Sequence, residues 1–137
     1  MDLIADLMIK EHSNLDKELE EFEKEPNQDK LDKFRWCLEK HFFIEEKAIF
    51  YIYQSIVGKE VENIFDVMKE HGEVLDLIKL IDNKLPEKDE ENILKLKEIL
   101  EKHLKFENSV FYPKLDIDLN PEQRKIIIEK VKEVVRV

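Results

Sequence analysis

The sequence predicts an all-α protein: an up-down-up-down four-helix bundle with a short C-terminal fifth helix, formed as a single domain by residues 1–137. The 137 residues include only two glycines and four prolines, and the chain is rich in the helix formers Glu, Lys, Leu and Ile. The few helix breakers are evenly placed, and the stretches between them carry apolar residues at spacings of three and four. A chain of this length can bury a substantial core.

The first two predicted helices span residues 2–24 and 29–57 and are separated by Pro26-Asn27. Proline interrupts a helix, and asparagine favours a turn. Each helix has one predominantly apolar stripe that predicts a buried face. The stripes are Ile4, Met8, His12, Leu15, Leu19 and Phe22 in the first helix, and Leu31, Phe34, Leu38, His41, Glu45, Ala48 and Ile52 in the second.

The next two predicted helices span residues 60–84 and 89–112, with Gly58 before the third, Pro86 after it, and Pro113 ending the fourth. Short connections between long helices favour antiparallel neighbours. The stripes are Ile64, Val67, His71, Leu75, Ile78 and Leu85 in the third helix, and Ile93, Leu96, Leu100, His103, Glu107 and Val110 in the fourth.

The fifth predicted helix spans residues 121–136, because Asn120-Pro121 is typical of an N-cap followed by proline at the first helical position. Its stripe of Ile127, Val131 and Val134 is expected to cover the end of the bundle or a partner. An exposed remnant of this stripe would favour a homodimer.

Six polar residues interrupt the four apolar stripes, and together they are the strongest functional signal in the chain. They are all four histidines and two glutamates that follow a histidine by four residues: His12, His41, Glu45, His71, His103 and Glu107. A His-x-x-x-Glu pair places both side chains on one face of a helix, one turn apart. A buried glutamate without a partner would cost several kcal/mol or would have to take up a proton. A metal site would explain both glutamates.

The spacing of these six residues from the predicted turns places them at the same level along the bundle axis. In an antiparallel hairpin, two residues at the same level are equidistant from the turn. The midpoints lie at Pro26-Asn27 for His12 and His41, at Gly58 for Glu45 and His71, and beside Pro86 for His71 and His103. The sequence therefore predicts that all six residues share one layer of the bundle.

A near-repeat relates the two helical hairpins. Residues 38–41 (Leu-Glu-Lys-His) recur at 100–103, and Lys10-Glu11-His12 recurs in part as Lys69-Glu70-His71. A site between the two halves would have approximate two-fold symmetry, as a two-metal centre does.

The types of ligand residue restrict which metals could bind but do not identify one. Histidine and glutamate suit iron, zinc or manganese. A histidine taken alone is more commonly a core or surface residue, but six polar residues in one predicted layer favour metal binding. A ferritin-like site is a poorer match because its motif is Glu-x-x-His. The single cysteine, Cys37, and the absence of His-Glu-x-x-His exclude a zinc finger and a helical zinc protease.

The arrangement resembles the hemerythrin-like (HHE, cation-binding) family. That family carries a histidine on the first helix, His-x-x-x-Glu on the second, a histidine on the third, and His-x-x-x-Glu or a close variant on the fourth. The matching elements here are His12, His41-Phe42-Phe43-Ile44-Glu45, His71 and His103-Leu104-Lys105-Phe106-Glu107. The resemblance covers nearly the whole chain.

The resemblance implies two non-haem iron ions with an oxo or hydroxo bridge, for which zinc or manganese could substitute. The two glutamates would bridge the ions, with His12 and His41 on one and His71 and His103 on the other. Oxygen-carrying members have a fifth histidine, whereas the positions four residues from His71 are Val67 and Leu75. We therefore expect more redox reactivity than in a carrier. Glu11, Glu46 and Glu70 flank the ligands, about 100° away on an ideal helix.

Three functions are compatible with such a centre. The first is a binding protein that captures O2 or NO for sensing, buffering or delivery. The second is a di-iron oxidoreductase that reduces O2, peroxide or NO, or that repairs iron centres, with a redox partner protein. The third is iron storage or homeostasis.

The remaining composition restricts the partners. A net charge of −10 disfavours nucleic acid and anionic membranes. The longest apolar run, Ala48–Tyr53, is too short to cross a membrane. The start of the chain carries Asp2 and Asp6 and no basic segment, so we expect no signal peptide and a cytoplasmic protein. The three tyrosines are expected at interfaces.

Overall fold

The computed structural model describes residues 3–58 and 61–135, and every regular element in these residues is helical. The elements are α1 (Ile4–Lys24), α2 (Gln28–Phe43), the π-helical η1 (Ile44–Phe50), α3 (Tyr51–Val57), α4 (Glu62–Lys84), α5 (Glu90–Phe106), the π-helical η2 (Glu107–Phe111), α6 (Tyr112–Asp118) and α7 (Pro121–Val135). The predicted helix ends at residues 2, 60 and 136 lie outside the described residues.

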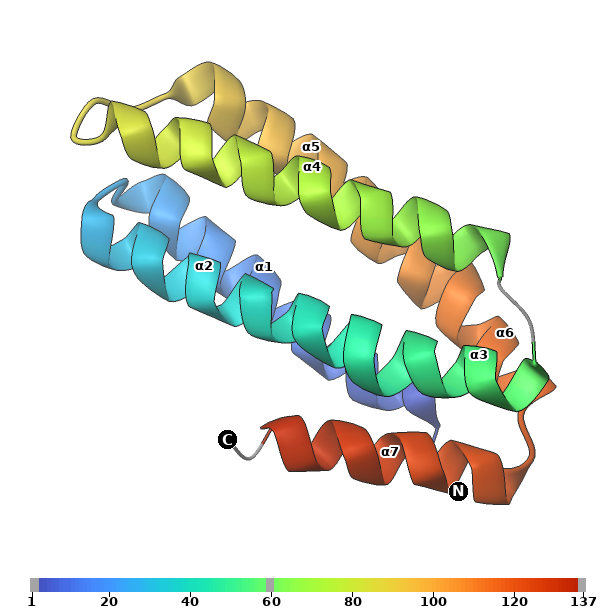
Figure 1. The fold of residues 1–137 in the computed structure, drawn as a ribbon. Coiled ribbons are helices and arrows are strands. Elements are labelled where there is room, and N and C mark those ends of the chain that lie inside the picture. The colour runs from blue at the N-terminus through green and yellow to red at the C-terminus, as the bar shows by residue number, and fades with distance from the viewer. Residues whose placement is uncertain (1–2, 59–60, 136–137) are drawn as a thin grey trace.

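The elements combine into five helices in space. α2, η1 and α3 run on as one long rod, and α5, η2 and α6 form another (Figure 1). These two helices pack antiparallel with α1 and α4, and α7 turns back to pack beside α1, η1 and α3 (Figure 1). The predicted all-α architecture, an up-down-up-down bundle with a fifth C-terminal helix, is confirmed.

The predicted breakers act at the helix ends. The Asn27 side chain accepts a hydrogen bond from the Lys30 amide at 2.9 Å and caps α2. Gly58 ends α3 with φ +73°, a left-handed conformation that glycine adopts without steric cost. Asn120 and Gln123 exchange backbone-to-side-chain hydrogen bonds of 2.9 and 3.0 Å, a capping box at the start of α7.

The expectation that Pro113 ends the fourth helix is wrong, because the helix continues to Asp118. The π-helical turn η2 immediately precedes the α6 segment that contains Pro113. A π turn replaces the ordinary i→i−4 bonding with i→i−5. The wider turn makes room for the proline ring, which would clash with the preceding turn of a regular α-helix.

The apolar core consists of two clusters, one toward each end of the bundle. The first joins α1, η1, α6 and α7, and includes Met8, Phe50, Tyr112 and Val131. The second joins α1, α2, α4 and α5, and includes Leu15, Phe34, Ile78 and Leu100. Burial of apolar area in both clusters is the main force that holds the helices together.

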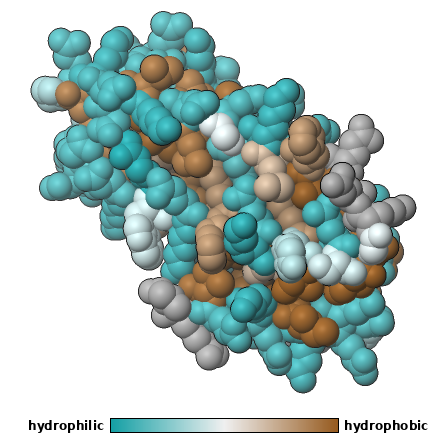
Figure 2. Space-filling model, viewed as in Figure 1, coloured by the Kyte–Doolittle hydropathy of each residue, from teal (hydrophilic) through white to brown (hydrophobic). Residues whose placement is uncertain are grey.

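Helix α7 covers the bundle itself. Ile127, Ile128 and Val131 are buried in the first cluster, and the α7 residue Arg124 donates to the carbonyl oxygens of Asp116 and Leu119 at 2.8 and 2.7 Å. Hydrophilic side chains cover most of the face seen in Figure 2, with apolar side chains showing between them. No helix within residues 3–58 and 61–135 is long and apolar enough to span a membrane.

Candidate metal centre

The six predicted ligand residues meet in one layer between the two apolar clusters. Each is at most 3 % exposed, and both glutamates are completely buried. Neighbouring residues on each helix belong to opposite clusters: on α1, for example, His12 lies between Met8 and Leu15. The common height predicted from the breakers is therefore present in the structure.

All four histidines direct the same ring nitrogen, Nε2, toward the carboxylates. For Glu45 Oε1, the distances are 3.2 Å to His41 Nε2 and 3.1 Å to His71 Nε2. For Glu107 Oε1, they are 3.2 Å to His12 Nε2 and 3.4 Å to His103 Nε2. Each carboxylate thus faces one histidine from each half of the bundle.

The side chains divide into two overlapping groups that share both carboxylates. One group is His12, His41, Glu45 and Glu107, and the other is Glu45, His71, His103 and Glu107. Within each group the donor atoms lie within 4.8 Å of one another. Two overlapping buried clusters with shared carboxylates are the pattern of a binuclear metal site.

Many buried polar atoms of this layer have no hydrogen-bond partner, which indicates whether metal ions would fit there. Nine side-chain nitrogen and oxygen atoms of the six residues are buried without a hydrogen-bond partner in the described part of the chain, among them every Nε2 and both oxygens of Glu107. Buried polar atoms are almost always satisfied in folded proteins. Seven of the nine, the four Nε2 atoms and three carboxylate oxygens, belong to the inner side of the layer, where the Nε2 atoms approach the carboxylates. These atoms are nitrogen and oxygen donors, so the residues present fit metal ions.

The charges of the two carboxylates support the same conclusion. Burial, reinforced by the charge of Glu45, raises the pKa of the Glu107 carboxyl well above its ordinary value. Two buried carboxylates this close resist being ionised together unless cationic charge compensates them. Metal ions would supply that charge.

Both glutamates lie in π-helical turns, η1 for Glu45 and η2 for Glu107. Such turns are frequent at functional sites, where they redirect a side chain or alter the course of a helix. The equivalent turns in the two halves extend the near-repeat seen in the sequence.

The outward-facing nitrogen, Nδ1, differs among the histidines. His12 Nδ1 lies 2.6 Å from the amide oxygen of Asn108, and His103 Nδ1 lies 3.4 Å from Glu70 Oε1. His71 Nδ1 lies 3.8 Å from Glu46 Oε1, an ion-pair distance. Among the described residues, neither His71 Nδ1 nor His41 Nδ1 has a hydrogen-bond partner, and His41 Nδ1 also has no carboxylate at ion-pair distance. Glu46 and Glu70 point away from the centre on their own helices, as expected, but they reach histidines of neighbouring helices.

Tyr112 is a site residue that the sequence analysis missed. It was expected at an interface, yet its side chain is completely buried and its hydroxyl donates to Glu45 Oε2. Burial, followed by the charges of Glu107 and Glu45, raises the pKa of Tyr112 well above its ordinary value, which keeps the hydroxyl available as a donor.

The ring of Phe42 stacks on His71, with centroids 3.8 Å apart.

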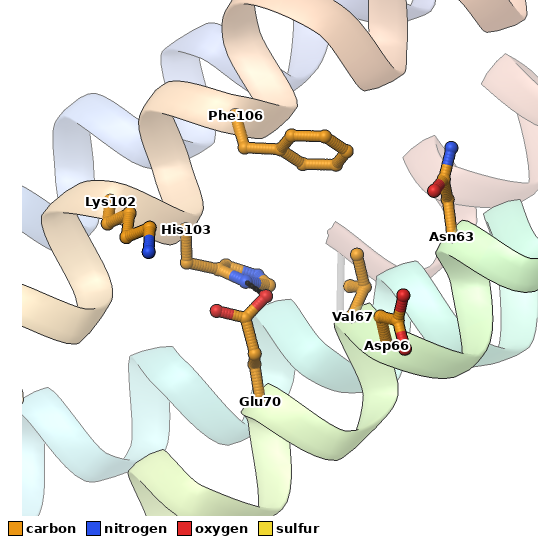
Figure 3. Close-up of a pocket in the computed structure, with 7 residues that line it drawn as sticks. All are labelled: Asn63, Asp66, Val67, Glu70, Lys102, His103 and Phe106. Atoms are coloured by element: carbon orange, nitrogen blue, oxygen red, sulfur yellow. Dashed lines mark hydrogen bonds and ion pairs between the residues drawn. The ribbon is translucent and has the colours of Figure 1, made fainter.

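A solvent-open pocket of about 360 Å³ reaches the centre from one side, between α4 and α5. His103 forms its inner wall, with Glu70, Val67 and Phe106 beside it (Figure 3). The carboxylate of Glu70 points at the His103 ring from the opposite helix (Figure 3). Of the six residues of the buried layer, His103 is the one that lines this pocket.

Comparison with known proteins yields one family. The family model described as the hemerythrin HHE cation binding domain matches residues 3–119, which contain all six residues of the buried layer. Neither the curated proteins nor the solved structures include a match to this chain.

Proposed function

Because the chain belongs to the hemerythrin HHE cation-binding domain family, we propose that it holds two iron ions in the buried layer and binds or reacts with O2 or NO there. Its biological role would be the sensing, buffering or delivery of that small molecule. The observation that carries the proposal is the set of unsatisfied nitrogen and oxygen atoms buried in one layer.

The ligand assignment follows the two overlapping groups. His12 and His41 form the first ion position, and His71 and His103 form the second ion position. Glu45 and Glu107 belong to both groups, so each carboxylate would be shared between the two ions. When bound, the iron pair supplies Lewis acidity and the ability to gain and lose electrons.

The number of protein donors leaves room for a small ligand. Each position would have two imidazole nitrogens and a share of two carboxylates. Sites that react with small molecules keep a coordination position open for them. One turn from His71, Val67 is fully buried and Leu75 is packed against the second apolar cluster. Neither side chain can bind a metal, so the chain lacks the fifth histidine of oxygen carriers.

The residues around the layer hold it and control access to it. Tyr112 fixes one oxygen of Glu45 and leaves the other to face His41 and His71. The apolar clusters above and below exclude bulk water from the layer. The pocket beside His103 is the opening through which a molecule as small as O2 or NO would approach.

The experiment that tests the proposal is a stopped-flow reaction of the reduced, iron-loaded protein with O2 and, separately, with NO. A binding protein should give a spectral change that persists and reverses when the gas is removed. Fast irreversible oxidation with turnover by an external reductant would instead indicate a di-iron oxidoreductase. Iron that is readily lost to a chelator, without reaction with either gas, would indicate storage.

The matched control is the Glu107→Ala variant treated in the same way. It retains the four histidines but loses one carboxylate shared by both groups. Reaction at the wild-type rate in this variant would show that the chemistry does not depend on the paired site.

A further inference from the structure

We propose that the second ion position holds its ion more tightly than the first, because the carboxylates of Glu46 and Glu70 face the outer nitrogens of its two histidines. This inference rests on the proposed two-ion centre. It goes beyond that proposal by making the two halves of a nearly symmetric site chemically different.

The near-repeat identifies where the symmetry is broken. An offset of 62 residues relates His41 to His103 and Glu45 to Glu107, and the same offset pairs Glu46 with Asn108. Both of these following residues face an outer histidine nitrogen: Glu46 faces His71, and Asn108 faces His12. The equivalent contact is therefore made by a carboxylate in one half and by a neutral amide in the other.

The second pair of contacts differs as well. Glu70 precedes His71 and faces His103 Nδ1 at 3.4 Å, whereas Glu11 precedes His12 in the same way. The contact expected by symmetry would join Glu11 to His41, but in the described residues His41 Nδ1 has neither a hydrogen-bond partner nor an ion-pair contact. His71 Nδ1 also lacks a hydrogen bond, but it has the ion-pair contact with Glu46 at 3.8 Å. The first ion position therefore has one amide contact, and the second has two carboxylate contacts.

The physical effect of these contacts is on ligand strength. A carboxylate that accepts from an imidazole N–H, as Glu70 does for His103, fixes the orientation of the ring and makes the other nitrogen a stronger donor. At 3.8 Å from His71, the Glu46 carboxylate acts through its charge rather than through a hydrogen bond. An amide oxygen also orients the ring but carries no full charge, so it raises donor strength less. The Nε2 atoms of His71 and His103 should therefore be stronger metal ligands than those of His12 and His41.

The aromatic environment adds to the difference. Phe42 stacks on His71 with rings inclined by only 12°, so the ring of His71 is held in one orientation. The ring contacts of His12 and His41 are edge-on or tilted, with centroid distances of 4.8 Å or more. A ligand that is already oriented loses less conformational freedom when the ion binds.

The chain is well suited to a direct test because its four histidines are the four histidines of the centre. The full-length protein would be labelled with ¹⁵N-histidine, loaded with Zn²⁺ as a diamagnetic probe, and equilibrated with increasing amounts of a competing chelator. Nuclear magnetic resonance would then follow the ring nitrogens. We expect the His12 and His41 resonances to return to their metal-free positions first, while His71 and His103 stay bound to zinc.

Three variants assign the cause. Glu70→Gln should weaken the tighter site by about 10- to 100-fold, the range typical of lost outer contacts to metal ligands. The control Glu73→Gln removes the same charge from an exposed position of α4 and should leave the affinity unchanged. Asn108→Asp should strengthen the first ion position and reduce the difference between the two.

The outcomes separate this inference from the proposed function. Two bound zinc ions that leave together, or in the opposite order, would overturn the inequivalence while preserving the two-ion centre. Equal affinities of the Glu70→Gln and Glu73→Gln proteins would also overturn it. Failure to bind two zinc ions at all would refute the proposed centre and the inference with it.

Discussion

Replacing Glu107 by leucine should make the metal-free protein more stable while destroying its capacity for two metal ions. Glu107 is completely buried, and neither of its carboxylate oxygens has a hydrogen-bond partner in the described part of the chain. Folding the metal-free protein therefore removes this carboxyl from water without compensating hydrogen bonds. Leucine can fill a similar volume without that cost.

The size of the effect follows from the environment of Glu107. An unsatisfied buried polar group costs roughly 1–3 kcal/mol, and the imidazoles of His12 and His103 at 3.2 and 3.4 Å offset part of this cost. Replacing buried charged groups by apolar residues of similar size stabilises proteins by as much as about 1–4 kcal/mol. We expect the unfolding free energy to rise within that range, which is a gain of about 3–12 °C in Tm for a chain of this size.

The assay is urea unfolding of wild-type and Glu107→Leu proteins, first with a chelator and then with saturating Zn²⁺. With saturating Zn²⁺, the wild-type protein should become more stable than Glu107→Leu, because only wild type binds both ions. A ligand at 1,000 times its Kd stabilises the folded state by about 4 kcal/mol. Leu100→Ala, which removes a fully buried apolar side chain on the same rod of helix, serves as a packing control and should cost about 2–5 kcal/mol with or without metal.

The reasoning would be refuted if the metal-free Glu107→Leu protein were clearly less stable than wild type. That result would mean that the carboxylate is a structural partner of the histidines in the absence of metal.

Three further predictions concern single side chains. Glu45→Ala should lower metal occupancy from two ions per chain to one or none, as measured by elemental analysis. Tyr112→Phe should keep two ions but lower the unfolding free energy by roughly 1.5–3 kcal/mol, the worth of a hydrogen bond to a charged group, as measured with urea; an unchanged value would remove Tyr112 from the site. Asp116 accepts from the amides of Ile4 and Ala5 at 2.8 and 3.0 Å, so Asp116→Ala should cost about 1–2 kcal/mol and speed hydrogen exchange at the start of α1. Unaltered exchange there would contradict this capping role.

Much of the fold was predictable because the breakers and the apolar stripes agree. All six stripe positions predicted on α1, from Ile4 to Phe22, are buried. Two of the errors lie within or just after the π-helical turns, where the helical period changes. Val110 was predicted to be buried but is 50 % exposed, and its neighbour Phe111 is buried in its place. Ile52 is likewise only partly buried, whereas Tyr53 is buried.

The third predicted stripe also drifted, for a different reason. Leu75 and Leu85 are only partly buried, and Val74 and Ile81 occupy the core instead. A regular helix advances 3.6 residues per turn, so repeated steps of four residues rotate the stripe away from the core at Leu75. Leu85 has a separate reason, because it lies just after the end of α4 at Lys84. The predicted stripe took two successive steps of four around His71.

The inner layer of the site was predictable and its surroundings were not. The positions of the six layer residues follow from helix period and turn spacing, which are properties of the sequence. The contacts of Glu70 with His103 and of Glu46 with His71 depend on the distance and rotation between neighbouring helices. Tyr112 was missed because it follows the π turn η2, which carries its side chain into the layer.

The most direct test of the two-iron centre is metal content per chain by elemental analysis, with the optical spectrum recorded on the same aerobic sample. We predict two irons per chain and the oxo-to-iron charge-transfer bands of a bridged ferric pair. A well-folded sample reconstituted with ferrous iron under anaerobic conditions that contained no metal, or a single zinc, would contradict the proposed centre.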